Sequence, residues 1–371
     1  MIRLGTYNLE NLFDRPKIIN LEDNQESSRL LKLADQLQKE IGKTTYDKAQ
    51  IEQLLTDLKG YVTVRSDKGK FFVGQSKTKV KANGRADWDG GIEFIRVKFD
   101  DKQRENTARL VKSLNADVLC MIEVEGRQTL TDFMREFFPT SARLGYNMLI
   151  DSPIDPRGID IAIAWRKSSL GILRSNAYDR TMINGREASV WSRDCLEVEL
   201  KLNDGKYLWL LGNHFKSKFG GDTPKSIAKR TAQSQRVVEI LNERYNLKQD
   251  YVAVLGDLND TPDSAPMAPL YAAADLHDVF EVMNTPAADR YTYYYSGNPV
   301  SKRKTQIDYI FVSEALRPLV KDVSVHRGGM TAVAQGKIPE IQPMEGFTGW
   351  RDAASDHAAI TVDLDTLEMS A

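Results

Sequence analysis

Polar residues with the chemistry of a catalytic site lie where apolar, strand-like runs of the sequence begin or end. Two of the four histidines are among them: His214 follows an apolar run at 207–211, and His357 directly precedes Ala358-Ala359-Ile360. The full set consists of Asn8, Glu123, His214, Asp257, Asp308 and His357. A single Asp or Asn at such a position is explained by a turn that stops the strand. Six buried polar groups each need a partner, however, and a shared pocket at one edge of layered sheets would supply it.

The residue types in this set indicate phosphoryl chemistry. Carboxylate and amide oxygens, without a Cys or His trio, suit Mg²⁺ or Mn²⁺ rather than zinc. The two histidines, together with Lys216 and Arg157, supply donors for phosphate oxygens. In phosphoryl transfer the metal and such donors neutralise developing charge, while a carboxylate orients or deprotonates water. A purely structural polar network would give a similar pattern and is the alternative explanation.

Other catalytic motifs do not fit the sequence. Gly69 and Gly74 have the spacing of a phosphate-binding Walker A loop, but Gln75-Ser76 replaces its Lys-Ser/Thr pair. The sequence contains neither HExxH nor GxSxG. Ser355-Asp356-His357 is not a nucleophilic triad, because neighbouring side chains of an extended segment point to opposite faces.

The elements that position these residues are predicted from hydrophobic periodicity. Strands are predicted at 2–8, 117–123, 159–165, 196–202, 207–213, 251–257, 307–312 and 358–362. Helices are predicted at 27–41, 46–58, 103–114, 129–138 and 226–245. Several strands are almost entirely apolar, as expected for strands covered on both faces inside a layered α/β domain.

Composition and charge narrow the class of protein. The 371 residues are 41% hydrophobic and 28% charged, which excludes a disordered, collagen-like or coiled-coil chain. The formal charge of −1 excludes a uniformly basic face, so any polyanion must be bound by local clusters. Cys120 and Cys195 are too few for a disulfide framework and are predicted to be buried apolar residues. No apolar run approaches the length of a membrane span, and because the N-terminus shows no secretory signal we expect a cytoplasmic location.

Residues from about 15 to 100 differ from the rest of the chain. They contain two helical patterns and then a Lys-rich stretch from Arg65 to Arg85 in which Asp67 is the sole acidic residue before position 87. Within this stretch, residues 61–64 and 71–73 are predicted to form a hairpin. Trp88 either stacks on a nucleic-acid base or packs in a core. We interpret the segment as an insertion into a single domain that spans residues 1–371.

Five motifs follow one another along the chain: residues 6–14 (TYNLENLFD), Ile122-Glu123, residues 256–260 (GDLND), Ile307-Asp308-Tyr309-Ile310 and Ser355-Asp356-His357. In type and order they resemble the motifs of the endonuclease/exonuclease/phosphatase superfamily, and the resemblance covers residues 1–14 and about 105–371. Residues 156–162 (PRGIDIA) and 213–218 (NHFKSK) resemble the bacterial extracellular-nuclease branch most. The resemblance implies an α/β (α+β) fold, a four-layer sandwich of two mixed, mainly antiparallel sheets flanked by helices.

The resemblance also implies a metal site. Glu123 is then the principal ligand of the ion, with Asn8 and Asp356 helping directly or through water. Glu10 contacts these ligands without binding the ion itself, and Asp160 has a structural role.

The resemblance further implies roles around the scissile phosphate. Asp257 orients or deprotonates the attacking water, and Asn259 holds that water or a phosphate oxygen. His357, polarised by Asp308, binds a non-bridging oxygen or acts as the base; which of Asp257 and His357 is the base stays open. His214 lies on the opposite side and stabilises the transition state or helps the leaving group. The residues expected to bind substrate phosphate are Arg157, Lys216 and Lys218.

The function predicted from these observations is a Mg²⁺- or Mn²⁺-dependent phosphodiesterase that acts on nucleic acid, DNA in particular. Three local basic clusters favour this substrate: Lys216/Lys218, Lys225/Lys229/Arg230 and Lys302/Arg303/Lys304. One alternative keeps the mechanism but changes the substrate to a phospholipid headgroup or small phosphoester. Another is a binding module that uses the same fold without activity.

Overall fold

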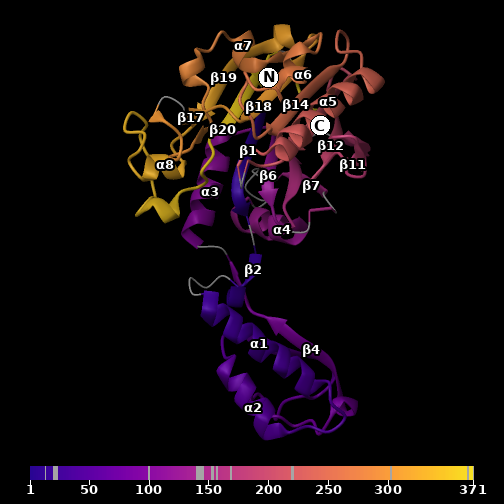
Figure 1. The fold of residues 1–371 in the computed structure, drawn as a ribbon, viewed down its shortest axis with the longest axis vertical. Helices are drawn as coiled ribbons and strands as arrows, with labels where there is room; N and C mark the ends of the chain where they lie inside the picture. Colours follow the sequence, from indigo (N-terminus) through magenta and orange to yellow (C-terminus); the bar gives the residue numbers. More distant parts are fainter. Residues whose placement is uncertain are drawn as a thin grey trace. The chain divides into compact units, whose positions relative to one another are not determined.

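The computed structural model describes residues 1–12, 14–19, 24–98, 101–138, 146–151, 154–155, 158–167, 169–218, 221–300, 303–365 and 367–370. The chain divides into two compact units (Figure 1). The first consists of Met1–Leu12 and Asp101–Ala371, and the second of Phe13–Asp100. The predicted phosphate ligand Arg157 and the basic residue Lys302 lie outside the described residues.

The first unit contains a six-stranded sheet with the order β19-β20-β1-β6-β8-β7. Its strands are β1 (Ile2–Leu12), β6 (Val118–Val124), β7 (Asn147–Asp151), β8 (Asp160–Trp165), β19 (Val320–His326) and β20 (Ala359–Leu364). Strand β1 is central: it pairs antiparallel with β20 and parallel with β6. The other pairs of this sheet are antiparallel.

A second six-stranded sheet has the order β15-β18-β14-β13-β12-β9. Its strands are β9 (Leu170–Arg174), β12 (Cys195–Lys201), β13 (Tyr207–His214), β14 (Tyr251–Asp257), β15 (Leu276–Asp278) and β18 (Asp308–Ser313). Strands β13 and β14 are parallel, and β18 runs antiparallel to β14. The end of β14 therefore meets the start of β18.

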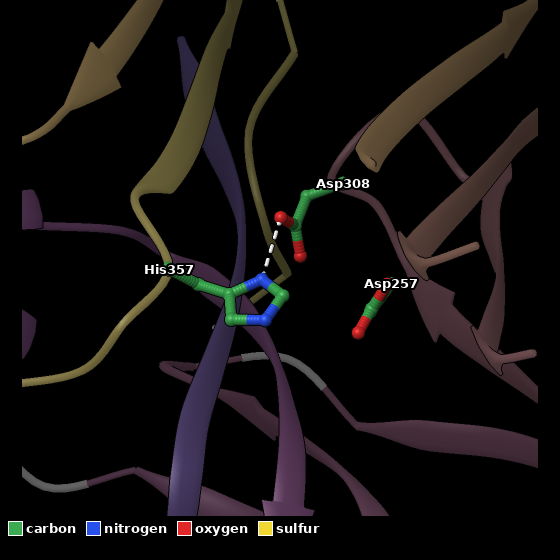
Figure 2. A group of neighbouring side chains, drawn as sticks. All are labelled: Asp257, Asp308 and His357. Carbon is green, nitrogen blue, oxygen red and sulfur yellow. Dashed lines mark hydrogen bonds and ion pairs between the residues drawn. The ribbon is translucent and has the colours of Figure 1, made fainter. Parts of the chain in front are cut away.

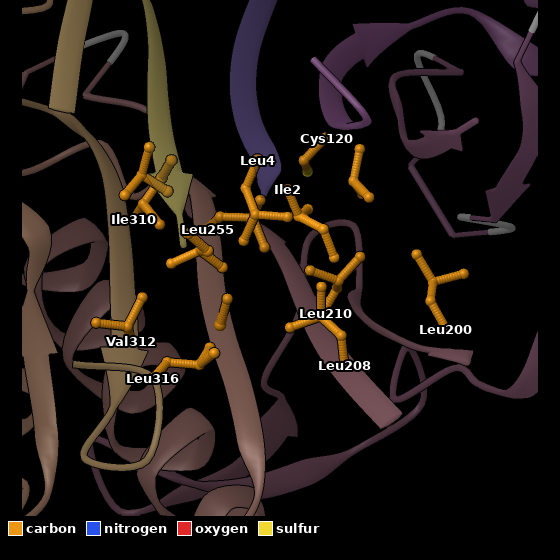
Figure 3. Close-up of a cluster of buried hydrophobic side chains, with 14 of the residues drawn as sticks. Ile2, Leu4, Cys120, Leu200, Leu208, Leu210, Leu255, Ile310, Val312 and Leu316 are labelled. Atoms are coloured by element: carbon orange, nitrogen blue, oxygen red, sulfur yellow. The ribbon is translucent and has the colours of Figure 1, made fainter. Parts of the chain in front are cut away.

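The core between the two sheets is built from the apolar strands (Figure 3). Leu4 and Cys120 of the first sheet cluster with Leu210, Leu255 and Ile310 of the second, and all five are 0% exposed. Burying such side chains stabilises the fold by roughly 1.5–3 kcal/mol for each large aliphatic residue. This apolar contact holds the strand ends of both sheets in fixed positions.

Helices cover the outer faces of the two sheets. On the first sheet, α3 (Asp101–Leu114) and α4 (Gly126–Phe137) supply apolar side chains to a cluster with β1 and β6. On the second, α5 (Pro224–Arg244) and α6 (Ala268–Ala272) supply side chains to a cluster with β13 and β14. Thr223 caps the start of α5 through its side chain, and Pro224 occupies the first turn. The predicted sandwich of two mixed, mainly antiparallel sheets between helices is confirmed.

Short elements connect these layers. They are α7 (Val279–Val282), α8 (Thr331–Ala334), η4 (Ala287–Asp289), η6 (Arg317–Leu319), η7 (Trp350–Asp352) and the strand pairs β10 (Arg180–Ile183) with β11 (Arg186–Ser189) and β16 (Tyr293–Tyr294) with β17 (Lys304–Thr305). Both cysteines are free and buried, as predicted. Within the part of the chain that the structure describes, we find no helix of the length and apolar character that a membrane span requires.

The second unit has a core of its own. It contains β2 (Asp14–Pro16), η1 (Lys17–Ile19), α1 (Asn24–Ile41), α2 (Lys48–Asp57), β3 (Val62–Gly69), η2 (Arg85–Asp87), β4 (Trp88–Phe94) and β5 (Arg96–Lys98). The amphipathic helices α1 and α2 pack Leu37 and Ile51 against Phe71 and Trp88. The two predicted helices of this segment are present.

The predicted hairpin within the second unit is wrong. Strand β3 pairs with β4, from Val62 opposite Phe94 to Gly69 opposite Trp88, and not with residues 71–73. Phe71 is instead fully buried in the core, and its neighbour Phe72 bridges to Val80. Because Trp88 is 4% exposed and its indole Nε1 donates to Tyr46 Oη at 2.7 Å, it packs in this core and offers no face for a base.

Candidate active site

Three neighbouring strands of the second sheet bring polar residues to one edge. His214 ends β13 and Asp257 ends β14, and these two residues are paired in register. Asp308 begins β18, directly opposite Asp257. All three are buried, with at most 1% exposure. The sheet topology thus gathers residues that are up to 94 positions apart in the sequence.

The first sheet brings Asn8 and Glu123 to the same edge. The amide Nδ2 of Asn8 on β1 donates to Asp257 Oδ2 at 3.0 Å, so a hydrogen bond joins the two sheets at the site. His214 Nε2 lies 3.7 Å from Glu123 Oε1 on β6 and 3.7 Å from Asp257 Oδ2. Glu123 has φ +65°, a conformation uncommon for residues other than glycine, which is typical of a strained functional position.

His357 reaches the site from the segment before β20. Its Nδ1 lies 2.9 Å from Asp308 Oδ2, and Figure 2 shows the imidazole beside both Asp308 and Asp257. Ser355 fixes this segment, because its hydroxyl donates to the backbone oxygen of Asn8 at 2.7 Å and accepts from His357 N at 3.0 Å. All six residues of the predicted set therefore come together, and Asp356 Oδ1 lies 3.7 Å from His357 Nε2.

Four carboxyl groups of the site have pKa values above their usual range. Burial and then the Asp308 carboxylate raise the pKa of Asp257 to about 7. Burial and then Asp356 raise the pKa of Glu10 to about 8. Burial also raises the pKa values of Glu123 and Asp356. Crowded buried carboxylates with raised pKa values are the environment in which a bound cation relieves electrostatic repulsion.

His357 responds in the opposite direction. Burial by itself lowers the pKa of its imidazole, but the carboxylates of Asp308 and Asp356 outweigh burial and raise the pKa well above its usual value. The two carboxylates therefore favour the protonated, cationic form of the His357 imidazole. A cationic imidazole beside a phosphate oxygen is a strong hydrogen-bond donor.

The site has the composition of a divalent-metal centre. Asp257, Asp308 and His357 each offer one ligand atom, and these atoms all lie within 4.8 Å of one another. Asp308 Oδ1 is buried without a hydrogen-bond partner among the described residues, as expected of an oxygen that binds an ion. The carboxylate oxygens of this group, with those of Glu123 and the amide oxygen of Asn8 beside them, fit a hard divalent cation, whereas a protonated His357 would not bind one. The ligand roles predicted for Glu123, Asn8 and Asp356 remain predictions.

Other predicted residues lie around this centre. Asn259 has φ +55°, donates its backbone N–H to Asp257 Oδ1 at 2.9 Å, and donates from Nδ2 to the backbone oxygen of Phe215 at 3.2 Å. Glu10 donates its backbone N–H at 3.0 Å to the Oδ1 atom of Asn8, which is one of the predicted metal ligands. Asp160 is buried at the start of β8, opposite Val124 of β6.

The two predicted substrate-binding lysines differ. Lys216 Nζ donates to the backbone oxygen of Ser217 at 2.8 Å. Lys218 Nζ forms an ion pair with Asp260 Oδ1 at 2.6 Å, and Asp260 also binds the fully buried Arg230. Arg230 of the predicted basic clusters thus serves inside the protein rather than on its surface.

Sequence reasoning missed Arg193, which is 1% exposed beside the site. Its Nε lies 2.9 Å from Asp155 Oδ2, and its Nη1 donates to the backbone oxygen of Phe215 at 3.2 Å. Its positive charge also lowers the pKa of Glu123, against the effect of burial. Arg193 precedes a strand that ends away from the site, so a search of strand ends overlooks it. The signal was a pair of neighbouring opposite charges, Arg193 and Asp194, between the apolar residues Trp191 and Cys195.

A model of the endonuclease/exonuclease/phosphatase family matches residues 81–361. No curated protein matches the sequence. The matched residues include β6 and every strand of the second sheet. They also include all of the predicted site residues except Asn8 and Glu10.

Solved structures share the fold at low sequence identity. An endonuclease/exonuclease/phosphatase from Bacteroides vulgatus has 13% identity and a TM-score of 0.51, with 100% of this chain and 99% of that chain covered. D. rerio TDP2 in complex with a single-strand DNA product has 17% identity and a TM-score of 0.50, with 73% and 94% covered. A mannosyl-6-phosphatase from Bacteroides thetaiotaomicron has 15% identity and a TM-score of 0.50, with 98% and 99% covered.

Proposed function

Because the chain belongs to the endonuclease/exonuclease/phosphatase family and is a metal-dependent phosphoesterase, we propose that it hydrolyses phosphodiester bonds of nucleic acid, DNA in particular, with Mg²⁺ or Mn²⁺. The observation that carries the proposal is the buried group of Asn8, Asp257, Asp308 and His357, which both sheets build together. Oxygen ligands favour these two ions over softer metals.

Each residue of the site has a separate role in the proposed reaction. Asp257 is held by hydrogen bonds from Asn8 and Asn259 and orients the attacking water, whose proton it accepts. His357, kept charged by Asp308, donates to a non-bridging phosphate oxygen. The water oxygen forms the new bond to phosphorus, the bond to the leaving oxygen breaks, and His214 lies across the site to stabilise or protonate that oxygen. Glu123 and Asn8 would hold the divalent ion, which supplies charge neutralisation at the phosphate when bound.

Two further observations favour a nuclease within this family. Lys216 follows His214 closely and supplies a cation on the side of the leaving group. Residues 213–218 keep the motif of the bacterial extracellular-nuclease branch, to which we assign the chain. We also interpret the unit Phe13–Asp100 as an insertion in one catalytic domain, since the first unit is formed by the chain on both sides of it.

The second candidate function is a phosphoesterase for small molecules, including sugar phosphates and phospholipid headgroups. It is favoured by the Bacteroides thetaiotaomicron mannosyl-6-phosphatase, which aligns over nearly the full length of both chains. The two candidates share the site and differ in the group attached to phosphorus.

Plasmid nicking and cleavage of single-strand oligonucleotides with Mg²⁺, with Mn²⁺ and with excess EDTA test the proposal. We expect metal-dependent cleavage that Asp257→Asn and His357→Ala each reduce by at least about 10²-fold. Asp204→Asn is the matched control, because Asp204 is exposed in the turn before β13, at the far end of that strand. Cleavage by Asp257→Asn at the native rate would refute the site. Faster hydrolysis of mannose 6-phosphate or of sphingomyelin vesicles than of DNA would favour the second candidate.

A further inference from the structure

A pocket of about 580 Å³ opens beside the candidate active site, and none of its lining residues belongs to the metal centre. It is formed by the turn before β10, the segment between β11 and β12, and the residues that follow β13. The residues that matter for recognition are Asp155, Tyr178, Arg180, Trp191, Arg193 and Lys216.

The pocket is joined to the catalytic centre through one backbone carbonyl. The oxygen of Phe215 accepts from Arg193 Nη1 on the pocket side and from Asn259 Nδ2 on the catalytic side, each at 3.2 Å. His214 immediately precedes Phe215, and Lys216 follows it into the pocket wall. A group in this pocket would therefore lie next to a phosphate in the site, on the side of His214.

The lining of the pocket combines positive charge with an exposed aromatic ring. Arg180, Arg193 and Lys216 are cationic, and Asp155, which pairs with Arg193, is the one acid among the described lining residues. Arg180 also pairs with Glu187 at 3.4 Å while remaining largely exposed. Trp191 is buried, but Tyr178 is 75% exposed. Exposed aromatic rings are the surfaces on which nucleic-acid bases stack, and nearby cations neutralise the adjoining phosphates.

The turn that carries Tyr178 is anchored on both sides. Its neighbour Asp179 accepts from Arg236 Nε on α5 at 2.8 Å, and the backbone oxygen of Asp179 accepts from Val190 N at 2.9 Å. The backbone of Asp179 also donates to the oxygen of Asn176 at 2.9 Å. Because the turn is already fixed, the ring can be offered to a ligand with little loss of backbone entropy.

We propose that this pocket is a nucleotide subsite, in which Tyr178 stacks on the base next to the scissile phosphate while Arg180 and Lys216 neutralise the neighbouring phosphate. The inference rests on the proposed function and names the feature of the substrate that the enzyme recognises: a planar base rather than the phosphate alone.

Two single-strand oligonucleotides of equal length test the subsite, one with thymine bases and one in which every base is replaced by a tetrahydrofuran abasic residue. The two carry the same phosphates. We expect Tyr178→Ala to lower kcat/KM for the thymine strand by about 5- to 100-fold and to leave the abasic strand unchanged. Tyr178→Phe should retain the native preference. Tyr207→Ala is the matched control, because Tyr207 is an exposed tyrosine at the opposite end of β13 from His214.

Binding of fluorescently labelled strands in EDTA gives a second measurement that needs no hydrolysis. The native protein should bind the thymine strand more tightly than the abasic strand by at least about 5-fold, and Tyr178→Ala should remove this difference. Equal binding of the two strands by the native protein, or an undiminished preference in Tyr178→Ala, would overturn the subsite. The subsite would also be overturned if mannose 6-phosphate displaced the thymine and abasic strands equally well and Tyr178→Ala abolished this displacement. If neither strand is cleaved, the proposed nuclease function fails, and the binding difference still decides the subsite.

Discussion

The hydrogen bond between Asp308 and His357 sets the charge of the candidate active site. The Asp308 carboxylate raises the pKa of His357. It also raises the pKa of Asp257, which lies directly opposite Asp308 on the neighbouring strand. One carboxylate therefore holds a proton on the imidazole and delays the loss of a proton from its neighbour. A substitution of Asp308 is therefore expected to change the pKa values of His357 and Asp257 together.

We predict that Asp308→Asn moves the pH–rate profile of DNA cleavage to lower pH. Loss of the negative charge lowers the pKa of His357, so the charged imidazole is lost earlier as the pH rises. It also lowers the pKa of Asp257, so its carboxylate forms earlier. Both limbs shift in the same direction, by roughly one pH unit. Asp322→Asn on the exposed part of β19 is the control, and an unchanged or more alkaline profile for Asp308→Asn would contradict the assignment.

The raised pKa values also predict how stability depends on pH without metal. Asp257 and Glu10 have folded-state pKa values of about 7 and about 8, above their unfolded values, because burial and then neighbouring carboxylates oppose the loss of a proton from each as the pH rises. Their ionisation destabilises the fold progressively from about pH 4 to above pH 8. The elevated pKa of His357 acts in the same sense, because its stabilising charge is lost as the pH rises through that value.

We therefore expect the Tm of the first unit, which contains these groups, to fall by several degrees in EDTA between pH 6 and pH 9. Mg²⁺ or Mn²⁺ should raise Tm more at pH 9 than at pH 6, because the cation offsets the repulsion among ionised carboxylates. Glu10→Gln should reduce the fall, since it removes one of the groups that ionise. Thermal unfolding followed by circular dichroism measures these values, with KCl at matched ionic strength in place of the divalent salt. A Tm that rises with pH in EDTA would be inconsistent with the burial of these carboxyls.

At the scale of elements, the sequence predicted the central strands and missed the strands at the edges. The eight predicted strands are all present, because each carries either an apolar run or a regular alternation of apolar and polar residues that is largely buried. Strand β19 is half-exposed and mixes apolar with polar residues, so it carries no such run. Strand β9 is apolar in sequence but is a five-residue edge strand with mostly exposed residues, too short and too exposed to stand out as a buried strand. The false hairpin arose because Phe71 and Phe72 look like a strand locally, whereas the core of the second unit takes Phe71 as a buried side chain.

The same reasoning explains what could be predicted of the site. Residues at strand ends were found because topology brings such ends together. Arg193 lies outside any strand, and its role depends on a backbone oxygen of Phe215, which no pattern of side chains reveals. The exposed ring of Tyr178 was missed for a related reason: it lies in a turn whose position is set by contacts with α5.

Gly256 allows β14, which carries Asp257, to lie close to β13. It precedes Asp257 with φ +136°, and a Cβ atom there would lie 1.9 Å from the backbone oxygen of Asn213 on β13. We predict that Gly256→Ala forces β13 and β14 apart, lowers the free energy of unfolding by about 2 kcal/mol or more, and reduces activity by displacing Asp257 from His214. Urea unfolding and DNA cleavage measure the two effects. Gly349→Ala is the control, because nothing lies within 4 Å of its Cβ position and its backbone is extended.

At the scale of the whole molecule, two separate cores predict two separable unfolding events. Phe71 is fully buried in the second unit, and Leu210 is fully buried between the sheets of the first. Phe71→Ala should destabilise one transition by about 3–5 kcal/mol, and Leu210→Ala should destabilise the other by about 2–5 kcal/mol. Differential scanning calorimetry resolves the transitions. A single transition that both substitutions shift equally would show instead that the units unfold as one.

The pairing of β1 with β20 has a consequence for the timing of biosynthesis. The ribosome makes β20 and the neighbouring His357 more than 340 residues after Asn8. Until then the edge of β1 that faces β20 has no partner, and the Asp308 carboxylate has no imidazole to charge. A nascent polypeptide that stops before residue 357 therefore lacks both the strand that completes this sheet and the histidine that Asp308 contacts, so the site assembles only late in synthesis.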